Sequence, residues 1–421
     1  MPNDDTPLLG SASKPGSLAP LDKESMKSFS ICLGVSQILV LAAFKIVCNM
    51  STDLNNVQYY NLLLGIEIMM FVGFGYLMTF LRWYGLGAAG LTLLITCYGM
   101  ELALLFEPLF QNWWEKQIQI DLIALMNANF AVAALLISFG ALIGKINPLQ
   151  LWLLITIETA VYCFNKRVIL SKWLNIMDYG GTIIIHEFGA YFGLACAYMI
   201  GKPKDASKEK SSTVSDVFSI IGTAFLWIYW PSFVSGTLPI GSISAQRAIV
   251  NTILSLLGAT VTAFALSPLV NEMRLSPVHA QNATLAGGVS IGVTANLNLG
   301  PFGALLIGSG AGFLCTIGYA YVQPLLEAMI GLHDTCGVGN LHGMSSIFGA
   351  LVSALLPIWI SDAGAPKTQL AGLAMTLAVA IPSGALTGKL MTFLKDEEEV
   401  PLADDSSYWE VADDFEANTS Q

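Results

Sequence analysis

Charged residues are scarce in this sequence. Only 12% of its 421 residues are Asp, Glu, Lys or Arg, whereas 54% are hydrophobic and the mean hydropathy is +0.63. Ordinary soluble domains carry about 25% charged residues, so the composition argues against a soluble cytosolic enzyme. Disorder is excluded for the body of the chain, because its 21 Phe, 13 Tyr and 9 Trp must be buried somewhere. A membrane protein fits this composition.

Paired cysteines and basic clusters are also missing. The seven Cys include no Cys-x-x-Cys pair, and most lie in apolar stretches, where they behave as small hydrophobic residues. A disulfide scaffold is therefore not indicated. No basic patch suggests a nucleic-acid partner. The net charge of −11 comes from the end of the chain, since residues 396–421 hold ten acidic residues and no Lys or Arg.

Long apolar runs fill the remainder of the sequence. A helix that crosses a bilayer needs about 20 mainly apolar residues, and the chain has room for about twelve. We predict an all-α polytopic membrane protein with a polar tail at 1–28, a transmembrane domain at 29–395 and a solvated acidic tail at 396–421. Two runs, 149–164 and 282–297, are shorter than a usual span. The runs cover approximately residues 29–49, 60–81, 85–106, 121–143, 149–164, 182–201, 216–236, 248–269, 282–297, 302–323, 341–360 and 369–393.

Basic residues predict the orientation. An even number of spans places both termini on one side, and with that side in the cytoplasm the inner segments hold twelve Lys and Arg against six outside. This excess agrees with the positive-inside rule. The predicted inner loop Gly201–Asp216 carries four of these Lys and separates two halves of similar size.

Only four histidines are present, and two of them fall in or beside apolar runs. His279 and His333 lie in loop or span-end sequence, where we expect them to be solvated. His186 and His342 lie at hydrophobic positions, where an ionisable group is costly and indicates a functional site. The alternative is a core histidine that is hydrogen-bonded to a neighbouring helix.

A repeated spacing favours the functional interpretation. An Asp stands eight residues before each of the two, as Asp178 before His186 and Asp334 before His342, with Gly close after each Asp. Five predicted spans separate the two segments, so they enter the membrane from opposite faces, which is typical of a five-plus-five inverted repeat. Each Asp is placed to cap a helix, with its His about 12 Å further in. The alternative is that the Asp–His spacing occurs twice by chance.

Metal-dependent and hydrolytic chemistry has little support in the sequence. Zinc and iron sites require His and carboxylate ligands that converge on one point, which two separate Asp–His pairs do not provide. No serine or cysteine hydrolase motif is present. We therefore predict no metal, no cofactor and no enzymatic activity.

Several motifs resemble those of the Rhesus (Rh) glycoproteins, a branch of the ammonium transporter superfamily. The likeness covers about residues 30–395, and twelve spans match this branch better than the eleven-span ammonium transporters. The motifs are Asp178–Leu194, Phe225–Phe233, Val278–Val289 and His333–Met344.

The resemblance implies the ammonium transporter/Rh fold and a homotrimer with one hydrophobic pore per subunit. It implies the following pore residues: twin histidines His186 and His342, supporting acids Asp178 and Asp334, and a stacked outer gate of Phe130 and Phe233. Four departures from the family pattern are Val234, Glu187, Ser345-Ser346 and Lys166-Arg167. The basic pair replaces a vestibule acid and argues against concentration of ammonium at the outer mouth.

A function follows from the physics of such a pore. Burying a bare cation in hydrocarbon is costly, but ammonium can release its proton and cross as neutral ammonia, for which a neutral imidazole supplies one donor and one acceptor. We therefore expect an ammonia/ammonium channel in which ammonium is dehydrated and deprotonated at the pore mouth, with methylammonium as a possible analogue. The alternatives are a carbon dioxide channel and a non-conducting membrane scaffold.

Other features bear on processing and location. Asn49 begins an Asn-x-Ser sequon in the first outer loop and is a possible glycosylation site. The segments Asp4–Leu9 and Tyr408–Val411 resemble sorting signals, so both the plasma membrane and an endosomal or vacuolar membrane stay open. The further intramembrane acids Glu67, Glu101 and Glu158 have no assigned role.

Overall fold

The predicted apolar runs form helices. A computed structural model describes residues 23–52, 54–112, 117–203, 208–394 and 404–411. Within these residues, ten helices are long and apolar enough to cross a membrane by themselves. The two other runs are the short ones: 149–164 forms α6, and 282–297 belongs to a broken helix. The prediction of an all-α polytopic fold with about twelve membrane helices is confirmed.

The elements follow one another along the chain with several changes of helix type, marked η. In the first half they are α1 (Lys23–Val47), β1 (Cys48–Met50), η1 (Leu54–Tyr59), α2 (Tyr60–Ile68), η2 (Met69–Phe74), α3 (Gly75–Leu77), η3 (Met78–Phe80), α4 (Gly85–Asn112), β2 (Ile118–Ile120), α5 (Leu122–Gly140), α6 (Pro148–Phe164), η4 (Asn165–Leu174), η5 (Thr182–Glu187) and α7 (Phe188–Ile200). In the second half they are α8 (Thr213–Ser235), α9 (Ile243–Val270), α10 (Pro277–Asn282), η7 (Ala283–Leu285), α11 (Ala286–Ile291), η8 (Gly292–Thr294), α12 (Gly300–Ile317), η9 (Gly318–Val322), α13 (Gln323–Ile330), η10 (Gly339–Met344), α14 (Ser345–Leu355), η11 (Leu356–Ile358), α15 (Pro366–Thr392) and η12 (Asp405–Ser407).

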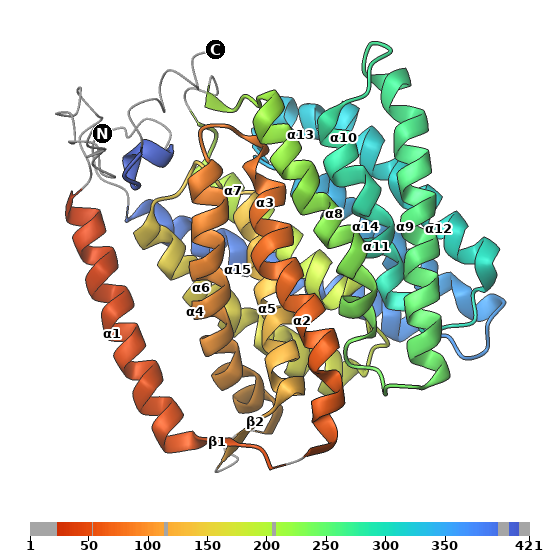
Figure 1. Ribbon diagram of the computed structural model, residues 1–421, viewed down its shortest axis with the longest axis horizontal. Coiled ribbons are helices and arrows are strands. Elements are labelled where there is room, and N and C mark those ends of the chain that lie inside the picture. Colours follow the sequence, from red (N-terminus) through yellow and green to blue (C-terminus); the bar gives the residue numbers. More distant parts are fainter. Residues whose placement is uncertain (1–22, 53, 113–116, 204–207, 395–403, 412–421) are drawn as a thin grey trace, which may run out of the picture.

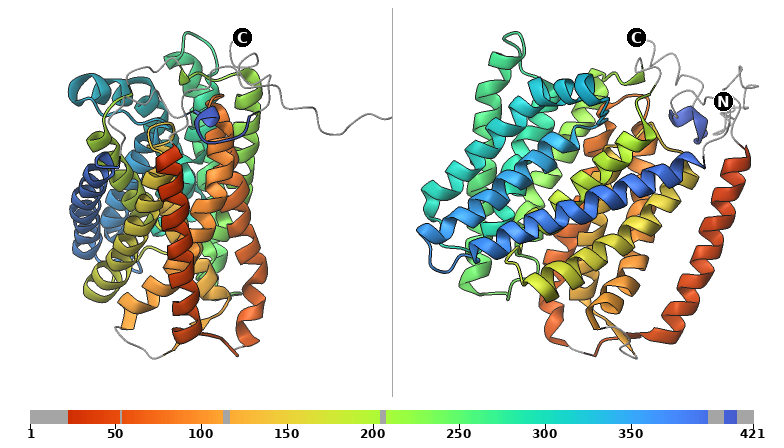
Figure 2. Two further views of the ribbon diagram at one scale, coloured as in Figure 1. Left: turned by 90° about the vertical axis from the view of Figure 1, so that its left-hand side faces the viewer. Right: turned by 180° about the vertical axis from the view of Figure 1, so that it is seen from behind.

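The long helices alternate in direction (Figure 1). Helix α1 begins and α15 ends on one side of the bundle, which we call the terminal face (Figure 2). Strands β1 and β2 lie on the opposite side, which we call the strand face (Figure 1). Helix α7 runs towards the terminal face and α14 runs away from it. The segments that carry His186 and His342 therefore enter the bundle from opposite faces.

A small parallel sheet closes the strand face and was not expected from the sequence. Cys48 pairs with Ile118 and Met50 with Ile120, and the Ser51 amide donates to the Ile120 carbonyl at 3.0 Å. The sheet joins the end of α1 to the start of α5. Helix α1 otherwise stands at the edge of the bundle (Figure 2).

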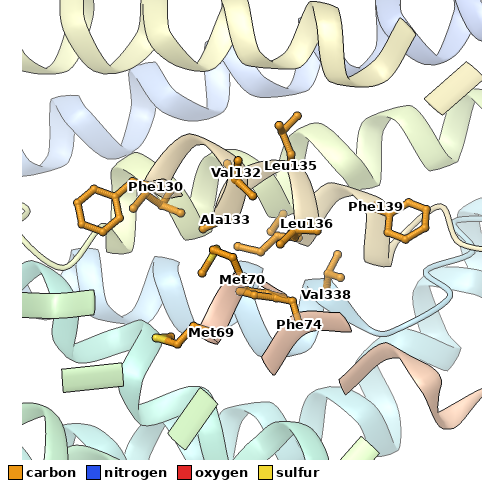
Figure 3. Close-up of a cluster of buried hydrophobic side chains, with 14 of the residues drawn as sticks. Met69, Met70, Phe74, Phe130, Val132, Ala133, Leu135, Leu136, Phe139 and Val338 are labelled. Carbon is orange, nitrogen blue, oxygen red and sulfur yellow. The ribbon is translucent and has the colours of Figure 1, made fainter. Parts of the chain in front are cut away.

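Local signals explain where helices start. Asn147 and Gln150 form a reciprocal capping box at α6, with Pro148 in the first turn, and Asp121 caps α5 by accepting the Ala124 amide at 2.7 Å. Helix α5 is the centre of the molecule, since residues 128–140 are all buried. Figure 3 shows part of the surrounding cluster, with Phe130 at one end and Phe139 at the other.

Glycines bring helices α9 and α12 into close contact. A Cβ atom on Gly308 would lie 1.9 Å from the Ser255 carbonyl oxygen, and one on Gly258 would lie 2.4 Å from the Leu305 carbonyl oxygen. Both positions therefore require glycine, because any side chain would overlap the neighbouring backbone. Small residues allow this approach of helices within a membrane.

Described structure extends into the ranges predicted as tails. Helix α1 begins at Lys23, six residues before the predicted start, and the acidic tail is not fully solvated. Asp404 and Asp405 are each only 3% exposed. Asp405 accepts the amides of Leu86 and Gly87, at 2.7 and 2.6 Å, and Asp404 pairs with Lys208. The Asp405 carboxylate thus caps the start of α4. The Tyr408–Val411 motif follows directly, whereas Asp4–Leu9 lies outside the described residues.

Candidate functional site

Two Asp-capped turns introduce the histidine segments. Asp178 accepts the amides of Thr182, Ile183 and Ile184 at 2.8–2.9 Å, and Asp334 accepts those of Val338 and Gly339 at 3.0 and 2.8 Å. The residue three after each Asp is a glycine with positive φ, 75° at Gly181 and 72° at Gly337. These glycines allow the turn to reverse so that the carboxylate faces the first helical N–H groups.

The helix types correct the predicted depth of the histidines. Helical structure begins only at Thr182 and Gly339, and both histidines lie in π-helical segments, η5 and η10. His186 is therefore four residues beyond its helix start, so the continuous helix on which the expected separation of about 12 Å depends is not formed. Single-turn π segments within helices often occur at functional sites, because they redirect side chains.

The two histidine rings meet in the interior. Nδ1 of His186 lies 3.2 Å from Nδ1 of His342, the ring centroids are 5.2 Å apart, and the residues are 1% and 3% exposed. At this distance the Nδ1–H group of one ring donates a hydrogen bond to Nδ1 of the other ring. Two neutral rings then leave one donor and one acceptor on their Nε2 atoms. Nε2 of His186 is buried and has no hydrogen-bond partner among the described residues.

A row of aromatic rings extends from this pair in both directions. Towards the strand face, Phe233 lies 6.0 Å from His186 and 4.8 Å from Phe130, centroid to centroid. The resemblance implies stacked Phe rings, but the two rings meet edge to face, with an interplanar angle of 77°. Trp230 stacks on His186 at 5.6 Å. Towards the terminal face, Phe74 stacks on His342 at 6.3 Å. Figure 3 shows Phe74 among the central apolar side chains.

Open space continues from His342 towards the terminal face. A cavity of about 20 Å³, lined by His342, Phe74 and Val338, is large enough for one water-sized molecule. A wider pocket of about 490 Å³ contains His279, Tyr319 and Glu327. Phe80 and Cys336 line both spaces, so the two adjoin. The row of rings therefore ends in a small apolar chamber that is followed by a polar vestibule.

The two remaining histidines are buried, contrary to expectation. His279 and His333 are each 5% exposed. Nδ1 of His279 lies 2.9 Å from the Ser267 hydroxyl, and Nε2 of His333 lies 2.9 Å from a Glu209 oxygen. The Lys145 ammonium donates to the His333 carbonyl at 2.6 Å, and burial lowers the pKa of Lys145 to about 8. Each ring thus has one polar partner, although Nδ1 of His333 is buried without a hydrogen-bond partner among the described residues.

The additional intramembrane acids have separate surroundings. Glu158 is fully buried and accepts from the Ser138 hydroxyl at 2.6 Å, while Glu101 accepts from Gln37 on α1 at 3.1 Å. Neither side-chain oxygen of buried Glu187 has a hydrogen-bond partner among the described residues. Glu67 is half-buried on α2. None of these acids lines the small chamber beside His342.

A charged cluster at the strand face includes a residue that sequence analysis missed. Lys166 donates to Glu107 at 2.6 Å and to Asn127 at 2.9 Å, and Arg167 also pairs with Glu107. Lys166 and Glu107 are buried, at 8% and 4% exposure. The available signal was the basic pair itself, since two cations at a helix end require a buried counter-charge.

Two other predictions concern single sites. No group of three or more His, Cys, Asp or Glu side chains suited to a metal ion occurs among the residues that the structure describes. Asn49 is exposed in β1 on the strand face, where it donates to Gln117. A sequon asparagine at this position is sterically accessible, and its glycosylation stays a prediction.

Comparisons with known proteins agree with this geometry. The model of the Ammonium Transporter Family matches residues 32–412. The chain is 36% identical over 399 residues to the ammonium transporter Rh type C of Xenopus laevis, which covers 87% of this chain and 84% of the relative. It is 40% identical over 379 residues to the ammonium transporter Rh type B of Bos taurus, with 83% of each covered.

Solved structures share the fold. The Rh50 protein of Nitrosomonas europaea, described as a member of the Rhesus protein family of channels, superposes with a TM-score of 0.77 at 33% identity. The match covers 88% of this chain and 97% of Rh50. Candida albicans Mep2 superposes with a TM-score of 0.67 at 19% identity, which supports the fold alone.

Proposed function

The chain belongs to the ammonium transporter family, in its Rhesus branch, and on this premise we propose that it is a channel for ammonia/ammonium. The single observation that carries the proposal is the contact between the two buried imidazoles, whose Nδ1 atoms are 3.2 Å apart, beside a chamber of about 20 Å³. A transport role is consistent with this arrangement.

Solvation determines which species can pass. Transfer of a bare cation into an apolar lumen costs far more than a few hydrogen bonds return, so ammonium loses its water and its proton at the pore mouth. Neutral ammonia still needs hydrogen-bond partners inside. The paired rings offer one donor and one acceptor through their Nε2 atoms, and they stay neutral because burial and mutual repulsion disfavour imidazolium.

The two phenylalanines act as the gate. Phe130 and Phe233 meet at 4.8 Å on the strand-face side of the histidines, and their exposures are only 5% and 2%. A molecule that moves from this face to His186 must displace them and leave its water behind. Sodium and potassium ions lack a proton to release, so the gate excludes them by their hydration cost.

Flux measurements in vesicles test this function. In His186→Leu, ammonia flux should fall to the background of the lipid, because one ring of the pair is lost. His279→Gln is the matched control, since His279 lines the wide polar pocket and its ring contacts the Ser267 hydroxyl. Simultaneous current recording distinguishes electroneutral passage from net charge movement. Unchanged ammonia flux in His186→Leu would contradict the proposal, and retained carbon dioxide flux alone would favour a gas channel.

Membrane placement and assembly complete the proposal. Ile38, Ile46 and Val261 are 67%, 70% and 70% exposed, which suits contact with lipid. We infer a homotrimer from the family, with residues 29–395 as the channel domain and the terminal face in the cytoplasm. The mass of the detergent-solubilised protein tests the trimer. A mobility shift that is lost in Asn49→Gln would place the strand face outside.

A further inference from the structure

A lysine ammonium lies at the outer gate. Nζ of Lys166 is 5.8 Å from the centroid of the Phe130 ring and 5.8 Å from that of Tyr162. Both distances are within the range of cation–π attraction. Phe130 is also the ring that contacts Phe233. The gate therefore holds a primary ammonium that belongs to the chain, at the place where an entering cation would contact the first aromatic ring.

The cluster keeps this charge in place. Two of the three Lys166 N–H groups are used by Glu107 and Asn127, at 2.6 and 2.9 Å. Glu107 is shared, because Arg167 pairs with its second oxygen. One carboxylate between two cations leaves a net positive charge. The side chains of Lys166 and Glu107 are 10% and 6% exposed, so water screens this charge only weakly.

We propose that Lys166 determines specificity by occupying the cation position of the outer gate, so that only the neutral amine enters from the strand face. The inference rests on the proposed function and refines it, because the proton is released in the aqueous mouth, before the gate. A free ammonium ion would have to approach a fixed ammonium that already holds the local carboxylate and ring faces. Ammonia meets no such repulsion.

The test separates ammonia from ammonium in the same assay. Initial influx into vesicles is measured at a constant external concentration of neutral ammonia, while pH and total ammonium are varied together to change the ammonium concentration. In the wild type, the rate should be independent of ammonium. In Lys166→Gln, which keeps hydrogen-bonding groups but loses the charge, the rate should rise with ammonium and saturate, by about ten- to a hundredfold for one weakly screened charge removed at about 6 Å.

Two variants control for charge and for position. Lys166→Arg retains the cation and should follow the wild-type pattern. Lys172→Gln removes a charge from the same segment at an exposed position and should also follow it. A Lys166→Gln rate that stays independent of ammonium would overturn the inference, as would a wild-type rate that already rises with ammonium.

The outcome is distinguishable from failure of the proposed function. If wild-type vesicles carry no more ammonia than His186→Leu vesicles, the channel function fails. If wild-type flux exceeds that background and Lys166→Gln has the wild-type dependence on ammonium, only the role of Lys166 fails. Lys166→Met supplies a second uncharged variant should Lys166→Gln not fold.

Discussion

At the scale of single residues, the arrangement of rings decides what crosses the interior. The rings of Phe233, His186, His342 and Phe74 follow one another at 5.2–6.3 Å. Such a row leaves no space for a hydration shell, and its polar atoms are those of the imidazoles. Each side chain therefore has a separate effect on flux that substitution can reveal.

Removal of a gate ring should make the pore wetter. Phe233→Ala deletes the contacts with both Phe130 and His186, and we expect osmotic water permeability to rise while ammonia flux persists. The cavity should also cost about 3–5 kcal/mol of stability. Stopped-flow light scattering of vesicles measures the permeability. Phe348→Ala, which removes a ring that packs against Gly310 on α12, should lower stability without a leak. Equal leaks in the two variants would contradict a gating role for Phe233.

At the scale of elements, the important feature is a helix that starts inside the protein. Segments η5 and η10 begin at buried turns, and their first N–H groups have no preceding helical carbonyl. Asp178 and Asp334 supply the missing acceptors. The carboxylates thus position the histidines indirectly, by fixing the starts of the segments that carry them.

Loss of such a cap should be costly. Asp334→Ala leaves the buried amide of Val338 and the part-buried amide of Gly339 unpaired, at about 1–3 kcal/mol for the buried group and less for the other. We expect a lower thermal unfolding temperature in detergent and reduced ammonia flux. Asp121→Ala removes a partly exposed cap of α5 and should cost about 1 kcal/mol. Equal losses of stability and flux in the two variants would contradict the role of Asp334 in fixing the start of η10.

At the scale of the whole molecule, residues 404–411 are attached to the bundle. Asp405 reaches the start of α4, and a Cβ atom on Gly90 would lie 2.4 Å from Trp409. Residues 404–411 thus contact a helix that lies more than 300 positions earlier in the chain. This attachment includes the motif that resembles a sorting signal.

Attachment of this segment should depend on pH. Burial raises the pKa of Asp405 to about 6, although the Gly87 and Leu86 amides oppose the rise. The attached segment therefore binds a proton more tightly than the released one, so attachment is strongest at low pH and weakens as pH rises through about 6. Hydrogen exchange of residues 404–411, corrected for intrinsic rates, measures this. In Asp405→Asn the dependence should disappear; its persistence would assign it to another group.

Sequence alone predicted the parts that obey a simple period or spacing. Apolar runs indicated the helices, and the repeated Asp–His spacing indicated a paired site. The spacing could not reveal the turns at Gly181 and Gly337 or the π-helical segments, because these depend on contacts between distant parts of the chain. Burial of His279 and His333 was missed for the same reason, since Ser267 and Glu209 lie on other elements. Glu107 was overlooked because its partners are about 60 residues away.

The opposite directions of the two histidine segments have a consequence for the direction of transport. Each histidine lies on an Asp-capped segment that enters from its own face, so the histidine pair itself does not favour flux in one direction. Any preference for one direction of flux must then arise at the two entrances, which differ. The Lys166 ammonium lies at the strand-face entrance, and the polar pocket of about 490 Å³ forms the other.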